Sequence, residues 1–253
     1  MNKYRRYLFY SIKAGLKSEV ATSHLSWMWW VLDPLFFMLI YTFISVIVFR
    51  STEPYFPVYV FIGLTVWNFF SKTLSGSVKL VKSRKTVLTR VYLPKWILTL
   101  ERMGNLLFKM SISWILVLIM MFIWQVPFSL QLFNMIPIMI VLLTVTFGLS
   151  SILLHFGVFM DDLKNIIDIF LRLLFYLSGV FYNIYKRVPD PFNKIILRSN
   201  PAAFLMEQAR KVIISQECPD YFWMGIWFGI GLAFAFIGVF TIYRYENSYA
   251  KVI

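Results

Sequence analysis

The chain has 253 residues, of which 59% are hydrophobic and 19% aromatic, while only 15% are charged. Soluble domains have roughly 45–50% apolar and about 25% charged residues, so the composition excludes an ordinary soluble domain, a disordered chain and most nucleic-acid binders. The 25 lysines and arginines outnumber the 12 acidic residues and give a net charge of +13. In a membrane protein such an excess is typical of loops that face the cytoplasm.

Residues 1–28 are predicted to form a cytoplasmic amphipathic segment. Within it, apolar side chains recur every four residues at Tyr4, Leu8, Ile12, Leu16 and Val20, while most of the basic side chains gather on the opposite side. A helix of this kind lies flat on a membrane surface. It serves either as an interfacial anchor or as a docking surface for a cytoplasmic partner.

Six apolar stretches follow. A helix needs about 20 mostly apolar residues to cross the hydrocarbon layer of a bilayer. Within residues 29–246, the stretches that meet or nearly meet this length are approximately 30–49, 58–77, 103–124, 135–160, 166–182 and 221–243. The sequence therefore predicts an all-α integral membrane protein with six transmembrane helices and a cytoplasmic tail at 247–253.

The fifth stretch is the shortest and contains Asp168 and Arg172. Residues four apart lie on the same face of a helix, so these two are predicted to form an intramembrane ion pair. Charges inside a bilayer are costly unless they are paired, and the pair has either a structural role or a role in proton relay.

The distribution of lysine and arginine predicts the orientation. Most of them lie before the first span, between the second and third spans, between the fourth and fifth, and in the tail. The positive-inside rule therefore places both termini in the cytoplasm.

Two connecting segments have distinctive compositions. Residues 79–94 mix basic and β-branched side chains and end at Pro94; they are too polar to span a membrane and too apolar to be a free linker. The long segment 183–220 contains an Asn200-Pro201 pair, in which asparagine caps a helix that begins at the proline. We expect two short re-entrant helices there, which serve either as a structural lid or as an outer gate.

The chain has no recognisable means of catalysis. None of its eleven glycines belongs to a phosphate-binding Gly-Lys-Ser/Thr loop, so any ATP and Mg²⁺ are expected in a separate subunit. The single Cys218 and the two histidines, His24 and His155, exclude an internal disulfide and a Cys/His metal cluster. We therefore expect neither a metal site nor a cofactor in this chain, and no enzyme activity.

An ordered series of short motifs runs through nearly the whole chain. They are Ser23–Trp29, Asp33–Leu35, Phe56-Pro57, Gly63-Leu64, Trp67–Phe70, Arg90–Pro94, Asp162–Asn165, Leu177–Tyr182, Asn200-Pro201, Arg210 and Tyr243–Glu246. This order resembles the permease subunits of type-2 ABC exporters for bacterial cell-surface polysaccharides. Two positions differ from the usual pattern of the family: Ser26 replaces a glycine before the first span, and Gly179 replaces a proline in the fifth.

The resemblance implies a homodimer that binds two copies of an ABC ATPase. It also implies that the amphipathic N-terminal helix and residues 79–94 contact the ATPase. The side chains expected to make the second contact are Lys82, Arg84, Lys85, Arg90 and Tyr92.

The resemblance further implies that the first and fifth helices line the conduit. Both are rich in aromatic side chains, on which sugar rings stack through their C–H faces. The candidate substrate-path residues are Phe36, Phe37, Tyr41, Phe175, Tyr176, Phe181 and Tyr182. The alternative is that these side chains face lipid or pack between helices.

The leading hypothesis is ATP-driven export of an undecaprenyl-linked polysaccharide across the bacterial plasma (inner) membrane. The cargo is an O-antigen foremost, or a capsule or teichoic-acid chain. One alternative is an exporter of a drug or simple lipid, and another is a membrane-embedded transferase that acts on lipid-linked sugars. Interaction with nucleic acid is not expected.

Overall fold

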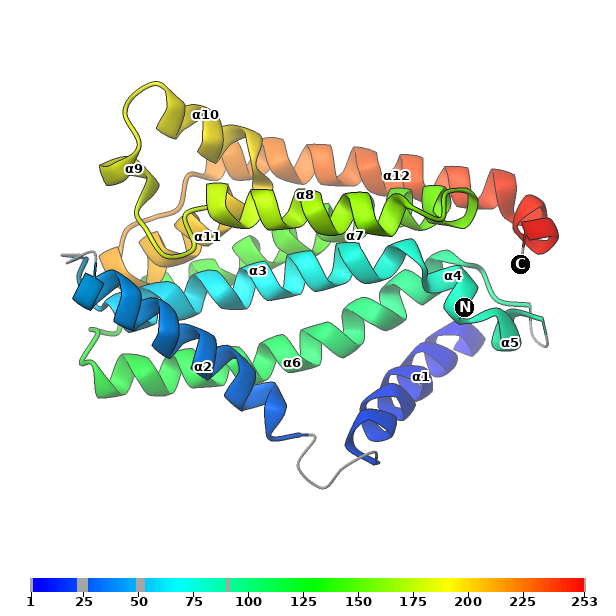
Figure 1. Cartoon of the computed structure of the whole chain (residues 1–253), viewed down its shortest axis with the longest axis horizontal. Helices are drawn as coiled ribbons and strands as arrows, with labels where there is room; N and C mark the ends of the chain where they lie inside the picture. The colour runs from blue at the N-terminus through cyan, green and yellow to red at the C-terminus, as the bar shows by residue number, and fades with distance from the viewer. Residues whose placement is uncertain (1, 22–26, 49–52, 90–91, 253) are drawn as a thin grey trace.

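The computed structural model describes residues 2–21, 27–48, 53–89 and 92–252, which are mostly helical and contain no strand (Figure 1). The prediction of an all-α protein is therefore confirmed for these residues. The longer helices are α1 (Asn2–Ala21), α2 (Trp29–Phe43), α3 (Phe56–Val78), α6 (Trp96–Ile123), α7 (Met135–Phe159), α8 (Leu163–Leu177) and α12 (Tyr221–Val252). The shorter ones are η1 (Ile44–Val48), α4 (Leu80–Ser83), α5 (Lys85–Leu88), η2 (Leu130–Asn134), α9 (Ile184–Arg187), α10 (Phe192–Ser199), α11 (Pro201–Arg210) and η3 (Lys211–Ser215).

Four helical segments among the described residues are long and apolar enough to cross a membrane. They cover Trp29–Ile47, Trp96–Ile123, Leu130–Phe159 and Tyr221–Glu246, at the first, third, fourth and sixth predicted spans. The second predicted span coincides with α3, which has 23 residues and includes the polar pair Ser71-Lys72. The fifth coincides with α8, which has only 15 residues.

Helix α3 forms the centre of the fold. The side chains of Val58, Val60, Phe61, Ile62 and Val66 are fully buried. They are covered because α3 packs against α2, α6, α7, α8 and α11. A largely buried helix can carry polar residues, because neighbouring helices contact most of its surface.

Helices α7 and α12 pack closely through small residues. A methyl group added to Gly148 would lie 2.7 Å from the carbonyl oxygen of Gly231, and one added to Gly238 would lie 2.6 Å from Ser151 Cβ. Glycines at these positions let the two backbones approach, and the resulting van der Waals contact holds membrane helices together.

The short helices gather at the two ends of the molecule. Figure 1 shows α9, α10 and α11 at one end, and α4, α5 and both chain termini at the other. Helix α1 is present as predicted, and it packs across α6, where Ile12 covers Gly104 and Asn105 lies against Gly15.

One local prediction concerns a helix start. The side chain of Asn200 accepts hydrogen bonds from the backbone N–H groups of Ala202 and Ala203, so the predicted cap of α11 is confirmed. Helix α2 begins at Trp29 and contains Pro34 in its interior.

Candidate functional site: a cavity with an aromatic and a basic end

A cavity of about 1050 Å³ is lined by α1, α2, α3, α6 and α8, together with Leu80 and Arg84. Its lining changes along its length from aromatic to charged. The aromatic residues are Phe37, Tyr41, Trp67, Phe175 and Tyr176, and the charged ones are Glu19, Lys72, Arg84, Glu101, Arg102, Lys109, Asp168 and Arg172. The five cations outnumber the three carboxylates, so the cavity suits an anionic ligand that also has surfaces for stacking.

At the aromatic end, rings from α2, α3 and α8 meet. Tyr41 stacks nearly parallel to Phe181, with ring centroids 5.2 Å apart and planes at 4°, and its ring lies 5.9 Å from that of Phe175. Trp67 of α3 packs on Phe175 at 5.5 Å. The structure therefore brings side chains of the first and fifth predicted spans together around one space.

The predicted aromatic residues divide into three groups. Phe37, Tyr41, Phe175 and Tyr176 line the cavity, and Phe181 covers Tyr41. Tyr182 donates a hydrogen bond from its hydroxyl to the carbonyl of Tyr176 at 2.9 Å. Phe36 is 51% exposed and does not line the cavity.

Sequence reasoning did not select Trp67 and Asn68 as candidate site residues, although both line the cavity. They belong to α3, which had not been proposed to line the conduit. The signal that could have identified them is the group of polar residues that begins beside Trp67 and interrupts the otherwise apolar sequence of α3.

At the basic end, most charges are paired. Lys109 Nζ lies 2.6 Å from a carboxylate oxygen of Glu19, and Lys72 Nζ lies 3.7 Å from one of Asp33. Arg102 donates from Nη2 to the carbonyl of Lys72 at 2.8 Å. Arg172 has no hydrogen bond or ion pair among the described residues and faces the cavity. It is therefore available to an anionic ligand.

The ion pair of Asp168 differs from the prediction. Asp168 pairs with Lys164, at 2.6 Å, instead of Arg172. Both cations lie four residues from Asp168 on the helix, so spacing alone could not separate them. Ser75 of α3 donates a hydrogen bond to the other carboxylate oxygen, which holds Asp168 against α3 on the Lys164 side.

Three of the five predicted ATPase-contact residues already have partners within the chain. Lys82 bonds to Asp161, which lowers the pKa of that carboxyl, and Arg84 bonds to the buried Glu101 at 2.6 Å. Lys85 is exposed. Tyr92 is 68% exposed and donates a hydrogen bond to Glu246, whose charge raises the pKa of the tyrosine. Arg90 lies outside the described residues.

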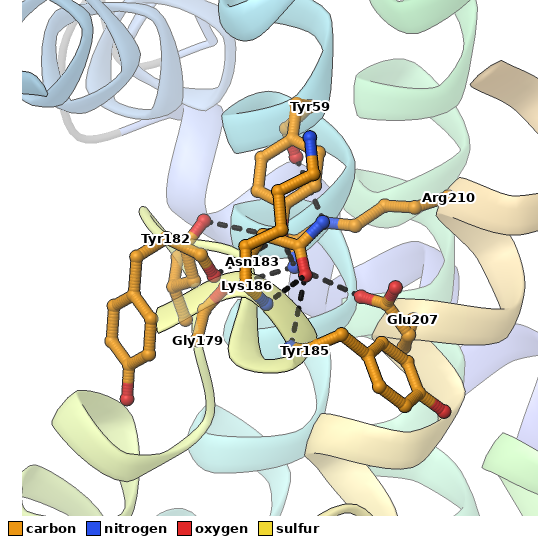
Figure 2. A network of polar contacts seen from close by, with 9 residues as sticks. Tyr59, Gly179, Tyr182, Asn183, Tyr185, Lys186, Glu207 and Arg210 are labelled. Carbon is orange, nitrogen blue, oxygen red and sulfur yellow. Dashed lines mark hydrogen bonds and ion pairs between the residues drawn. The ribbon is translucent and has the colours of Figure 1, made fainter. Parts of the chain in front are cut away.

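At the opposite end of the molecule, Arg210 joins three segments (Figure 2). Its side chain is 3% exposed, and its guanidinium carbon lies 3.6 Å from the centre of the Tyr59 ring. It donates from Nε to the carbonyl of Tyr59, from Nη1 to the hydroxyl of Tyr59 and the carbonyl of Gly179, and from Nη2 to the carbonyl of Val180. One buried cation thus binds α11 to α3 and to the turn that follows α8.

The described residues contain no group of three or more histidine, cysteine, aspartate or glutamate side chains that could hold a metal ion.

Comparison with known protein families identifies the family of this chain, which the geometry of the cavity alone does not. Residues 7–214 match the model of the ABC-2 type transporter family. The chain belongs to this family. Among its ABC-2 relatives, an O-antigen export system permease protein RfbA of Myxococcus xanthus is 29% identical over 220 residues, which cover 86% of this chain and 84% of the relative. Another protein of that name, from Klebsiella pneumoniae, is 24% identical over 241 residues, covering 94% and 91%.

Proposed function

We propose that this ABC-2 chain is the permease subunit of an ATP-driven exporter that moves lipid-linked O-antigen out of the cytoplasm. The observation that carries the proposal is the cavity, because one space joins stacked aromatic rings to a cluster of cations. Aromatic rings suit sugar, and cations suit the phosphate groups of a lipid carrier. The relatives named as O-antigen export permeases support the same cargo.

The proposed arrangement has six spans, with α3 and α8 added to the four long apolar segments. Most of helix α3 is buried against other helices, and its exposed Lys72 lines the cavity and lies 3.7 Å from Asp33, which supports its place among the spans. Helices α10 and α11 lie at the end opposite the termini, and most of α11 is buried, as expected of helices that enter the outer leaflet and return. The basic segment 79–89 lies at the end that holds both termini, and by the positive-inside rule this supports a cytoplasmic location for that end.

The proposed assembly contains two copies of the chain and two ATPase subunits. Large apolar side chains on α2 and α8 are exposed, including Leu39, Phe43, Phe170 and Leu173. In a dimer whose conduit runs between α2 and α8, these faces meet the second copy. The ATPase supplies the ATP and Mg²⁺ chemistry and contacts α5 and its surroundings at the cytoplasmic end.

The proposed position of the carrier's phosphate groups is the basic end of the cavity. Arg172 lies there without an ion pair among the described residues, and an unpaired charge at membrane depth is unfavourable. A diphosphate would neutralise it through bidentate hydrogen bonds that a lysine cannot reproduce. The undecaprenyl chain then extends into the bilayer.

Deletion of the gene, followed by complementation, tests the proposal. We expect surface O-antigen to disappear and lipid-linked polymer to accumulate in the cytoplasm. Arg172→Gln should restore export poorly, whereas Arg198→Gln, a change at the opposite end, should restore it fully. Unchanged surface glycan in the deletion strain, with a loss of drug tolerance, would instead favour an exporter of small molecules.

A further inference from the structure

The aromatic end of the cavity is covered by a turn that is held by side chains from other helical segments of the chain. The turn follows α8 and contains Gly179, which adopts a left-handed conformation with φ of 64°. Two residues later, Phe181 places its ring flat on Tyr41 and 6.0 Å from the ring of Phe175. Phe181 therefore covers Tyr41 at the aromatic end of the cavity, shortly before the chain enters α9.

Contacts to this turn come from three other helical segments. Arg210 binds the carbonyls of Gly179 and Val180 at 2.8 and 2.7 Å, and the hydroxyl of Tyr59 donates to the carbonyl of Tyr182 at 3.1 Å. Ser45 of η1 makes a weaker contact to the carbonyl of Phe181 at 3.4 Å. The backbone on both sides of Phe181 is thus held mainly by Arg210 and Tyr59.

The contacts of Arg210 make a gradual release of the turn unfavourable. Its guanidinium is buried against α3 at Gly63, where any side chain would overlap it. Two of its four hydrogen bonds go to the turn, and each lost hydrogen bond to a buried charged group is costly, so these two bonds form or break together. A contact of this kind favours two discrete positions of the turn over a continuous range.

We propose that Phe181 is the outer plug of the conduit and that Arg210 is the residue that positions it. While Arg210 binds the turn, the Phe181 ring closes the aromatic end of the cavity. Opening requires the turn to leave Arg210, or to move together with α11. The inference rests on the proposed function because it treats the cavity as a conduit whose Phe181 end faces outward.

Cysteine labelling tests this closure without measuring transport. The reporter is Ser71→Cys, a nearly isosteric change in the cavity lining one helical turn below Trp67, made in a Cys218→Ser background. A membrane-impermeant methanethiosulfonate is applied to intact spheroplasts that contain the permease and its ATPase. We expect slow labelling in this parent, and fast labelling when Phe181→Ala removes the plug.

Three changes weaken the contact of Arg210 in different ways. Arg210→Met removes the donors, and Gly63→Ala places a methyl group where the guanidinium lies. Each should raise the labelling rate at least about tenfold, because several hydrogen bonds to a charge are lost. Tyr59→Phe removes only the hydroxyl contacts and should raise it about two- to tenfold, the range of a net hydrogen-bond contribution.

Two matched controls should leave the labelling rate unchanged. Gly225→Ala adds a methyl group in open space on α12, and Tyr249→Phe removes a hydroxyl that bonds to His155 at the other end of the molecule. Unchanged labelling in Gly63→Ala and Tyr59→Phe, with fast labelling in Phe181→Ala, would overturn the role of Arg210, even if Arg210→Met fails to reach the membrane. Slow labelling in Phe181→Ala would overturn the plug.

Failure of the proposed function has a different signature. A deletion strain with normal surface glycan would contradict O-antigen export and leave the labelling ratios as they are. Fast labelling of the parent from outside would contradict the proposed orientation; the same variants are then compared in inverted vesicles, where equal rates would overturn the plug and its positioning by Arg210.

Discussion

At the scale of single residues, Gly157 allows the closest approach between α7 and the end of α3. A methyl group at this position would overlap the carbonyl group of Val78, which belongs to the backbone and cannot rotate away. We expect Gly157→Ala to destabilise the protein by about 1–3 kcal/mol, the usual cost of overpacking. Thermal denaturation followed by size-exclusion chromatography in detergent measures the change. Gly229→Ala, which meets no atom within 4 Å, should keep the melting temperature of the unmodified chain.

Arg84 is expected to stabilise the fold, since its partner is buried. The side chain of Glu101 is only 4% exposed, and Arg84 Nη2 lies 2.6 Å from its carboxylate. Arg84→Met should lower stability by about 1–3 kcal/mol, because it leaves a buried acceptor without its donor. Glu101→Met in the same chain should recover part of the loss. Equal melting temperatures for Arg84→Met and the unmodified chain would show that the pair contributes nothing.

At the scale of elements, α5 offers a cleaner test of ATPase contact than the rest of the basic segment. Lys82 and Arg84 bind acidic side chains of the same chain, so changing them alters the permease itself. Lys85 is exposed. We expect Lys85→Glu to reduce co-purification of the ATPase by about two- to fivefold, as for the loss of one interfacial charge. The same charge reversal at the opposite end of the molecule, Lys194→Glu, should not affect co-purification of the ATPase. An equal loss of co-purification in both variants would exclude a specific role for α5.

The positions of the elements could be predicted from the sequence, but many of their contacts could not. Apolar length placed a helix at each of the six predicted spans, and the Asn200-Pro201 pair marked the start of α11, because both signals are local. The partner of Arg210 is 151 residues away at Tyr59, and that of Lys82 is 79 residues away at Asp161. Such partners depend on how helices pack, which no local pattern records.

The same distinction explains which aromatic residues were identified. A search of the first and fifth predicted spans found Tyr41 and Phe175, since the resemblance named those helices. It missed Trp67, which lines the cavity from α3. It also included Phe36, which lies on the same helix as Phe37 but does not line the cavity. Neighbouring residues of a helix point in different directions, so the face that lines a cavity depends on the orientation of the helix.

At the scale of the whole molecule, the exposed apolar faces predict where two copies meet. Leu39 of α2 and Leu173 of α8 are 56% and 60% exposed, and a conduit between α2 and α8 of both subunits would bury them. Two differently tagged copies, one with Leu39→Cys and the other with Leu173→Cys in the Cys218→Ser background, should therefore be joined by a flexible bis-maleimide.

Copies that each carry Phe236→Cys provide the comparison, because this residue is 73% exposed on α12 and should face lipid. Its cysteines should not be joined, since a dimer with its conduit between α2 and α8 leaves α12 on the outside. Cross-linking at Phe236 without cross-linking between Leu39 and Leu173 would place the interface on α12. The cavity of each copy would then remain separate, and the cargo would have to pass through a single chain.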